Sequence, residues 1–266
     1  MAISLEGKTA IVTASALDVG KAIAQKFVDS GARVMLAGLD DKALQAVSEE
    51  IDAAEGTLGR FPYVAQDRLS IGNLIAATVE KFERIDVLVN GAQTLNAPGG
   101  FLDLKPDAFD SAFGDNVRGV FQLSQAVAKR MIAQAGDGPT SGSIVNISSI
   151  AAERTVPELL TFSVSCAALD QLTRSMAISL APHQIRVNAI ALGGVMSGRL
   201  LNAFRDDETL RDDMLKVTPL GRLGEVSEAG DAALFLSSDQ ASYVTGQVLG
   251  LDGGRALLDP LASPVR

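Results

Sequence analysis

The sequence predicts an α/β protein in which helices cover both faces of a parallel sheet, the doubly wound arrangement. Short apolar runs alternate with longer amphipathic stretches along most of the chain. The apolar runs are nearly continuous, which is typical of parallel strands buried on both faces. Strand–helix alternation with right-handed crossovers then gives a doubly wound sheet.

The first strand and the first helices show the pattern. Residues Lys8–Thr13 (KTAIVT) indicate a buried strand. Residues Asp18–Ser30 carry one apolar face and are followed by Gly31, a typical helix C-cap. A second helix is expected over Lys42–Ala54, behind caps at Asp40 and Asp41. Further strands are expected at Ala32–Ala37, Arg60–Ala65, Ile85–Asn90, Ser143–Ser148, Arg186–Ala191 and Gln247–Leu251.

No interior linker long enough to mark a domain boundary interrupts this pattern. We expect one domain over residues 1–258 and a surface tail over 259–266, where two prolines occur. Loops are expected at Ala97–Gly100 and Gly136–Gly142. Ligands of such sheets bind outside the carboxyl ends of the strands, so residues that directly follow a strand are the candidates for a site.

The composition excludes several classes of partner. The 266 residues include 23 Lys and Arg against 32 Asp and Glu, a net charge of −9. This balance argues against binding to nucleic acid or to an anionic membrane. Cys166 is the single cysteine, which fits a reducing compartment, and no apolar run reaches the length of a membrane span. We therefore expect a cytoplasmic protein.

Five segments carry specific motifs: Gly142–Ser149 (GSIVNISS), Ile185–Ala191 (IRVNAIA), Tyr243–Gly254 (YVTGQVLGLDGG), Asp86–Asn90 (DVLVN) and Asn116–Phe121 (NVRGVF). Together they resemble the short-chain dehydrogenase/reductase family, and the resemblance covers nearly the whole chain, from Leu5 to Gly254. The resemblance implies a Rossmann-type sheet of about seven strands and hydride transfer between NAD(P) and an alcohol or ketone. It also implies a dimer or tetramer formed through two helices and the last strand.

The positions that the resemblance assigns to catalysis are only half kept. Asn116 and Ser149 match the family's asparagine and serine. Phe162 and Cys166 stand where the family has its tyrosine and lysine, with matching flanks on both sides. Phenylalanine has no proton to transfer, and general acid–base catalysis typically contributes about 10²–10⁴-fold. We expect this pair to be inactive in the family's usual reaction.

The glycine-rich turn that resembles the family's cofactor site is also altered. Residues Thr13–Gly20 read TASALDVG where the family has T-G-x-x-x-G-x-G, so that only Gly20 remains of three glycines. Asp18 replaces the glycine that lets the backbone approach a pyrophosphate. We expect Asp18 to cap its own helix and to weaken or abolish dinucleotide binding.

Of the other positions that the resemblance assigns to the cofactor, some are kept and some are changed. Leu39 stands where an acid would bind the NAD ribose. Asp67 matches an adenine-contacting aspartate, and a plain turn residue is an equal alternative. Asn90 ends the fourth strand in the motif N-G-A-Q, where the family has N-N-A-G. No cofactor is expected, or NAD or NADP if the turn still functions.

Other chemistries were weighed at the same cleft. A thiolate nucleophile at Cys166 needs a base, and His183, the single histidine, falls in an expected surface turn. One histidine and one distant cysteine offer no metal site. Ser149 without a histidine base indicates a retained strand-end hydroxyl, with binding of a substrate oxygen as the alternative. The acidic stretch Arg205–Asp213 is expected to form a solvated helix over the cleft.

Three functional hypotheses follow. The first is a non-catalytic subunit, self-associated or paired with an active paralogue that acts on a hydroxyacyl-type substrate. The second is an NAD(P)-dependent oxidoreductase with displaced catalytic groups. The third is a cofactor-independent enzyme or small-molecule-binding protein that uses the cleft near Ser149, Phe162 and Cys166.

Overall fold

A seven-stranded parallel sheet forms the centre of the computed structural model, which describes residues 3–91, 101–136, 141–155 and 157–258. The strand order is β3-β2-β1-β4-β5-β6-β7, and every neighbouring pair is parallel. This confirms the predicted doubly wound α/β fold. The strands are β1 (Thr9–Thr13), β2 (Arg33–Gly38), β3 (Leu58–Pro62), β4 (Val87–Asn90), β5 (Gly142–Ser149), β6 (Ile185–Leu192) and β7 (Val248–Leu251).

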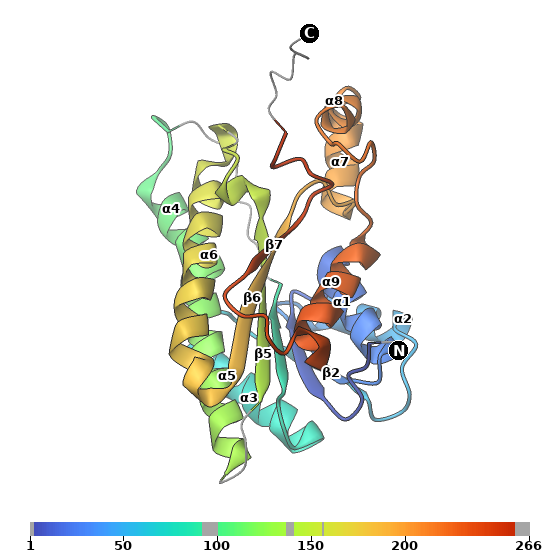
Figure 1. Ribbon diagram of the computed structural model, residues 1–266, viewed down its shortest axis with the longest axis vertical. Helices are drawn as coiled ribbons and strands as arrows, with labels where there is room; N and C mark the ends of the chain where they lie inside the picture. The colour runs from blue at the N-terminus through green and yellow to red at the C-terminus, as the bar shows by residue number, and fades with distance from the viewer. Residues whose placement is uncertain (1–2, 92–100, 137–140, 156, 259–266) are drawn as a thin grey trace.

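Helices cover both faces of the sheet (Figure 1). One face carries α1 (Asp18–Asp29), α2 (Asp41–Glu50) and α9 (Val226–Ser237). The other carries α3 (Arg68–Phe82), α5 (Val120–Ala135) and α6 (Leu160–Leu180), with α4 (Pro106–Phe113) beside α6. The short helices α7 (Gly198–Asp206) and α8 (Leu210–Lys216) follow β6 and lie at the top of Figure 1.

Burial on both faces explains the continuous apolar runs of the strands. All five residues of β1 are buried, and Ile11 and Val12 point to opposite sides of the sheet. Val12 packs in the cluster that contains Phe27 of α1, whereas Ile11 packs in the cluster that contains Phe82 of α3. Alternate residues of a strand thus serve two separate hydrophobic layers.

Most of the predicted elements are present, with ends shifted by a few residues. Asp40 caps α2 as expected, because its side chain accepts from the backbone N–H of Lys42 at 2.9 Å and of Ala43 at 3.4 Å. Gly31 follows α1 with φ +88°, the left-handed conformation expected of a C-cap glycine. The loop predicted at Ala97–Gly100, part of that at Gly136–Gly142 and the tail from Asp259 lie outside the described residues.

One helix prediction was wrong. The stretch Arg205–Asp213 is not a single helix, since α7 ends at Asp206 and α8 begins at Leu210. The Asp207 carboxylate accepts from Thr209, at 2.9 Å from its backbone N–H and 2.7 Å from its hydroxyl. Such a local side-chain turn competes with the helical backbone bonds.

In the described part of the chain, we find no helix with the length and apolarity needed to span a bilayer. The single-domain boundary at residue 258 and the cytoplasmic location stay predictions.

Candidate functional site

A cavity of about 300 Å³ opens at the carboxyl ends of β5 and β6, where the sequence predicted a site. Ser149 and Leu192, the last residues of these two paired strands, line its base. The other lining residues come from the segment after β5, the start of α6, the segment after β6, the end of α8 and the chain after β7, namely Ile150, Ala151, Arg154, Leu159, Phe162, Gly193, Gly194, Val217, Arg255 and Leu258.

Ser149 is held by two backbone groups. Its hydroxyl donates to the carbonyl of Leu192 at 3.3 Å and accepts from the N–H of Ala151 at 3.2 Å. The side chain is half-buried and borders the cavity. It therefore ends β5 as the expected strand-end hydroxyl, at the border of the cavity, and a hydroxyl oxygen can accept one further hydrogen bond.

Phe162 and Cys166 lie one turn apart on α6 and share its buried face, as their spacing predicted. They pack with Ala151 in a small apolar cluster beside the cavity. Phe162 is 5% exposed and Cys166 only 2%. Burial raises the pKa of the Cys166 thiol to about 12, and the nearby Asp170 acts in the same direction. At neutral pH the thiol is protonated, so it is a poor nucleophile.

The polar surroundings of Cys166 are tightly buried. Asp170 is 5% exposed, and desolvation raises the pKa of its carboxyl group, opposed by the Ser148 hydroxyl and by Arg174. Ser148 Oγ and Asp170 Oδ1 nevertheless lack a hydrogen-bond partner within normal distance. The hydroxyl is near enough to favour the ionised acid without completing a bond to it. Cys166 thus belongs to a closed interior cluster and does not line the cavity.

Asn116 lies in a π-helical turn (η1, Gly114–Gly119) between α4 and α5. π-Helical turns are rare and frequently occur at functional sites. The Asn116 side chain donates to Ser165 Oγ at 3.0 Å, and that hydroxyl donates to the carbonyl of Phe162 at 2.8 Å. Asn116 therefore packs η1 against the turn of α6 that carries Phe162.

The turn between β1 and α1 depends on Ala14, Gly20 and Thr13. Ala14 adopts φ +53°, a left-handed conformation that costs a non-glycine residue roughly 1 kcal/mol. Gly20 is required, because a Cβ there would lie 2.3 Å from the carbonyl oxygen of Ala14. Thr13 Oγ1 accepts from the N–H of Gly91 at 2.9 Å and joins this turn to the end of β4.

The prediction that Asp18 caps its own helix was wrong. Leu17 holds the N-cap position of α1, without a side-chain cap, and Asp18 is the first helical residue. Its Oδ2 instead accepts from the N–H of Gly198, the first residue of α7, at 2.7 Å. Because a helix N-terminus favours negative charge, one carboxylate serves the starts of two helices.

These contacts do not fit a dinucleotide. The carboxylate of Asp18 stands at the helix start where the resemblance places a pyrophosphate, and like charges repel there. Leu39, 78% exposed, follows β2 where a ribose-binding acid is expected. Asp67 caps α3 by accepting from the N–H of Leu69 at 2.8 Å, which agrees with its interpretation as a turn residue.

Asn90 supports the strand ends from within. Its side chain donates to Ser124 Oγ at 3.0 Å and to Asn146 Oδ1 at 2.8 Å, and it is 2% exposed. It therefore joins β4 to β5 and α5.

His183 is exposed in a one-turn 3-10 helix (Ala181–His183) after α6, far along the helix from Cys166, so a Cys–His pair is not formed. Within the described residues, no cluster of three metal-ligating side chains occurs.

The sequence reasoning did not find two arginines of the cavity, Arg154 and Arg255. The Arg154 guanidinium donates to the carbonyl of Ala256, through Nε at 2.7 Å and also through Nη2. Arg255 follows the pair Gly253–Gly254, where both glycines have positive φ and the chain turns back over the cleft. The Asp-Gly-Gly sequence after the last strand was the available signal, because it predicts such a turn.

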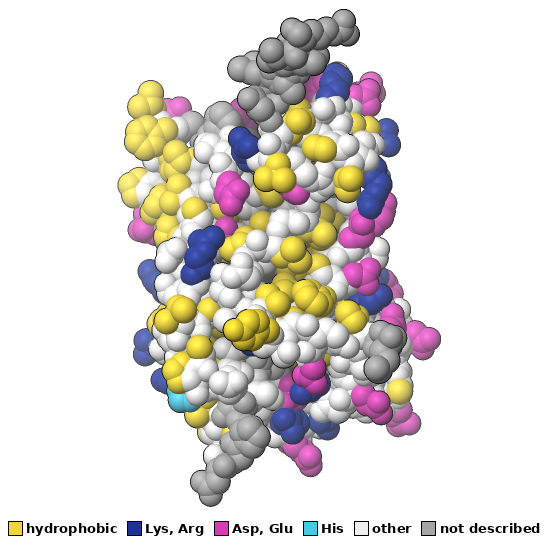
Figure 2. Space-filling model, viewed as in Figure 1, with side chains coloured by type: hydrophobic (Ala, Val, Ile, Leu, Met, Phe, Trp, Pro, Cys, Tyr) yellow, Lys and Arg dark blue, Asp and Glu magenta, His cyan; other side chains and the backbone are white. Residues whose placement is uncertain are grey.

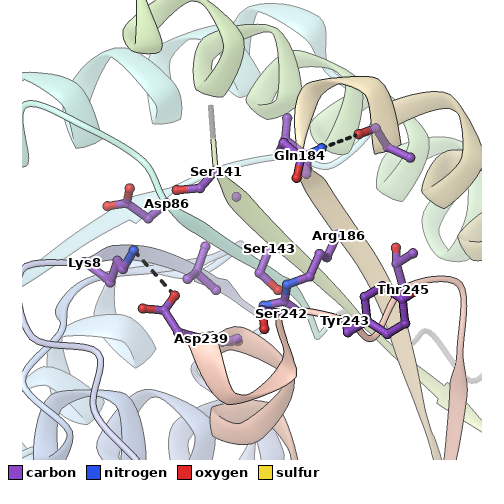
Figure 3. Close-up of a pocket in the computed structure, with 15 residues that line it drawn as sticks. Lys8, Asp86, Ser141, Ser143, Gln184, Arg186, Asp239, Ser242, Tyr243 and Thr245 are labelled. Carbon is purple, nitrogen blue, oxygen red and sulfur yellow. Dashed lines mark hydrogen bonds and ion pairs between the residues drawn. The ribbon is translucent and has the colours of Figure 1, made fainter. Parts of the chain in front are cut away.

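A second cavity, of about 580 Å³, lies at the opposite end of the strands (Figure 3). Its charged lining residues include Arg186 and the pair Lys8–Asp239, whose charged atoms are 4.0 Å apart. Arg186 donates to the carbonyls of Leu236 at 2.7 Å and Ser238 at 3.0 Å. The arginine thus ties β6 to the end of α9 and has a structural role.

Comparison with known proteins gives the family. The profile described as Enoyl-(Acyl carrier protein) reductase matches residues 14–256. The 3-oxoacyl-(acyl-carrier-protein) reductase FabG of Thermotoga maritima is 35% identical over 253 residues, which are 94% of this chain and 98% of the relative. A short-chain type dehydrogenase/reductase structure from Mycobacterium ulcerans has a TM-score of 0.89 at 29% identity, covering 96% of this chain and 91% of its own. The chain belongs to the short-chain dehydrogenase/reductase family.

Other members of the short-chain dehydrogenase/reductase family agree with this assignment. The 7alpha-hydroxysteroid dehydrogenase of Escherichia coli is 34% identical over 255 residues, with 95% of both chains covered. The 3-ketoacyl-(acyl-carrier-protein) reductase of Brucella melitensis, solved with NADH, has a TM-score of 0.87 at 30% identity and covers 95% of this chain and all of its own, 100%. These relatives are named as dehydrogenases and reductases, which supports oxidoreductase chemistry in the family more than a non-catalytic role.

Proposed function

We propose that this short-chain dehydrogenase/reductase does not perform the family's tyrosine-dependent reaction and serves as a non-catalytic subunit of an oligomer. The observation that carries the proposal is the buried Phe162, one turn before Cys166, at the position that the resemblance assigns to the proton-transferring tyrosine. Phenylalanine neither donates nor accepts a proton. The Cys166 thiol, with a pKa of about 12, does not replace it at neutral pH.

The retained groups cannot supply the missing proton transfer. Ser149 is held by the backbone at Leu192 and Ala151, and Asn116 packs on α6. Both side chains are uncharged and do not titrate near pH 7. They can hold a ligand oxygen or position a water by hydrogen bonding, but they are not suited to general acid–base catalysis. We therefore assign Ser149 a binding role in the cleft and Asn116 a positioning role.

Exposed apolar residues support self-association. On α5, Phe121 is 43% exposed, and on α6, Ile178 is 77% exposed. Hydrophobic side chains also gather across the middle of the face formed by the edge strand β7 (Figure 2). Leu249 of β7 is 40% exposed, and Tyr243, in the segment that precedes β7, is fully exposed. We propose a dimer or tetramer through these helices and this strand, with a second copy or with an active paralogue of the hydroxyacyl-reducing type.

The second candidate is an NAD(P)-dependent oxidoreductase with displaced catalytic groups. The comparisons favour this candidate over the first, because the relatives that match almost the whole chain are named as reductases and dehydrogenases. It requires the dinucleotide to bind although Asp18 stands at the start of α1. It also requires a proton donor outside position 162.

Cofactor titration separates the two candidates. NADH and NADPH are titrated by calorimetry into the native chain and into the triple variant Asp18→Gly, Phe162→Tyr, Cys166→Lys, and dehydrogenase activity is assayed with both. We expect no heat from the native chain at millimolar cofactor. Tight binding with turnover by the native chain would establish the second candidate and overturn the first. Native mass spectrometry from the source cells tests the assembly: a monomer contradicts the subunit role.

A further inference from the structure

The wall of the Ser149 cavity contains an arginine whose side chain has no hydrogen-bond or ion-pair partner among the described residues. Arg255 lines the cavity and is about half-buried. Among the described residues, its guanidinium makes no hydrogen bond and no ion pair within 4 Å, unlike that of Arg154, which binds the carbonyl of Ala256. Burial lowers the pKa of Arg255, and the charge of Asp252 offsets this only in part. Partial desolvation of an unpaired cation is unfavourable, so a bound anion would stabilise it.

The backbone that carries Arg255 is fixed in place. Asp252 Oδ1 accepts from the N–H of Gly254 at 2.9 Å, and Oδ2 accepts from the N–H of Ala256 at 2.6 Å. Arg255 N–H itself donates to the carbonyl of Asp252 at 3.2 Å. The carboxylate of Asp252 is thus engaged by its own turn, and the turn presents the arginine at a fixed point.

The guanidinium approaches the end of β6 because the two residues that follow this strand, Gly193 and Gly194, have no side chains. Gly194 has φ +75°, and Arg255 Nη1 lies 3.8 Å from where a Cβ of Gly194 would be. At Gly193 a Cβ would lie 2.6 Å from Cβ of Asp252. The two glycines therefore let the Asp252–Ala256 turn approach β6 closely and place the charged group beside the end of that strand.

The rest of the cavity is mostly apolar. Leu159, Phe162, Leu192 and Val217 line it, and none of the described lining residues is acidic. The one hydroxyl of the lining is that of Ser149. A volume of about 300 Å³ lies at the lower end of the range for small-molecule sites. Two cations line these apolar walls, Arg154, which is bound to the carbonyl of Ala256, and Arg255, which is free to pair with a ligand. Apolar walls with a few placed polar or charged groups are the usual composition of a site that orients a small amphipathic ligand.

We propose that this cavity binds a small organic monocarboxylate whose carboxylate pairs with Arg255 and whose apolar body packs against Phe162 and Val217. A planar guanidinium matches a carboxylate in two parallel hydrogen bonds. Arg154 is already held by the carbonyl of Ala256, so Arg255 is the arginine of the lining that is left to pair with a carboxylate. The proposal rests on the cleft being a ligand site, as in the non-catalytic assignment, but it requires neither cofactor nor turnover.

Calorimetry with three probes tests the proposal on the full chain without cofactor. Phenylacetate supplies both the charge and the apolar body, phenylacetamide is its neutral analogue, and acetate lacks the body. We expect phenylacetate to bind at least about tenfold more tightly than either of the others, since a hydrogen bond to a charged group and burial of a ring each contribute that much or more. Equal binding of phenylacetate and phenylacetamide, or no binding of phenylacetate at millimolar concentration, overturns the proposal.

Matched variants locate the charge. Arg255→Gln removes the cation and keeps an amide of similar reach, and Arg68→Gln removes the same charge from the exposed start of α3. We expect Arg255→Gln to weaken the binding of phenylacetate at least about tenfold and to leave the binding of phenylacetamide unchanged. Arg68→Gln should bind both probes as the native chain does. Equal weakening by both variants, or none by Arg255→Gln in a chain that melts as a folded protein, places the ligand elsewhere. Because no dinucleotide is present, failure here is separate from the outcome of the cofactor titration.

Discussion

Changing Asp18 to asparagine tests whether its charge excludes a dinucleotide. Asparagine keeps a side-chain oxygen that accepts from the N–H of Gly198, so the start of α7 stays attached to α1. What changes is the negative charge at the start of α1. The variant therefore separates the electrostatic effect from the structural one.

The magnitude follows from the position of the carboxylate. Two unit charges about 4 Å apart repel by about 1 kcal/mol in water and about 4 kcal/mol at an effective dielectric constant of 20. Asp18 is exposed, so water screens it and the lower part of that range applies. A gain of about 1–2 kcal/mol corresponds to a dissociation constant about 5- to 30-fold lower.

The assay is an NADH titration followed by the fluorescence of the nicotinamide, for which a chain without tryptophan gives little background. We expect Asp18→Asn to bind NADH about 5- to 30-fold more tightly than the native chain. The control is Asp29→Asn, an equal charge change at the far end of α1, about 16 Å away along the helix axis. If the native chain and Asp18→Asn bind NADH equally, the carboxylate does not exclude the cofactor and the reasoning fails.

Three further predictions concern stability. Gly193→Ala, whose Cβ meets packed atoms at 2.6 Å, should lower stability by about 1–3 kcal/mol in thermal unfolding, whereas Gly72→Ala, with nothing within 4 Å, should raise it by about 0.5–1 kcal/mol; equal effects would contradict the packing. The Cys166 thiol has a pKa of about 12 when folded against 9.0 ordinarily, so the unfolded state ionises first and stability should fall as pH rises from about 9 toward 12. Cys166→Ala should make that fall shallower, because the rest of it comes from Tyr63, whose pKa burial raises from 10.0 to about 12; an unchanged profile would exclude the cysteine as a cause. The Arg222 side chain and the backbone N–H of Glu225 lower the pKa of Glu228 from 4.5 to about 2. The stability that the ionised Glu228 contributes is therefore complete above about pH 4.5 and is lost as the pH falls toward 2. In Glu228→Gln, stability measured by urea unfolding should depend less on pH in that window, and a dependence as steep as that of the native chain would refute the assignment.

The fold could be predicted because the central strands are buried on both faces and therefore have continuous apolar runs. β1 and β6 show this, since nearly every residue is buried and the sequence alone marks both within a residue or two. The buried pair Phe162–Cys166 was also predictable, because residues four apart on a helix share a face. Local periodicity determines all of these features.

The errors concern features that depend on distant residues. The Asp18 carboxylate binds an N–H that is 180 residues away in the sequence, and no local pattern reveals that distance in space. Arg255 escaped notice for the same reason, since only the closed turn after β7 brings it to the ends of β5 and β6. The break between α7 and α8 depends on Asp207, whose preference for a local turn outweighed the helical charge pattern.

The order of strands also constrains how the chain is made. β1 is synthesised first, yet it lies between β2 and β4, and its second edge stays unpaired until residue 90 has left the ribosome. β4 in turn waits for β5, which ends at residue 149. The nascent chain therefore carries an apolar, unpaired strand edge through much of translation, a state prone to aggregation. A fragment that stops before β4 lacks the partner that completes the first strand, so proteolytic or truncated N-terminal pieces will depend on chaperones to stay dispersed.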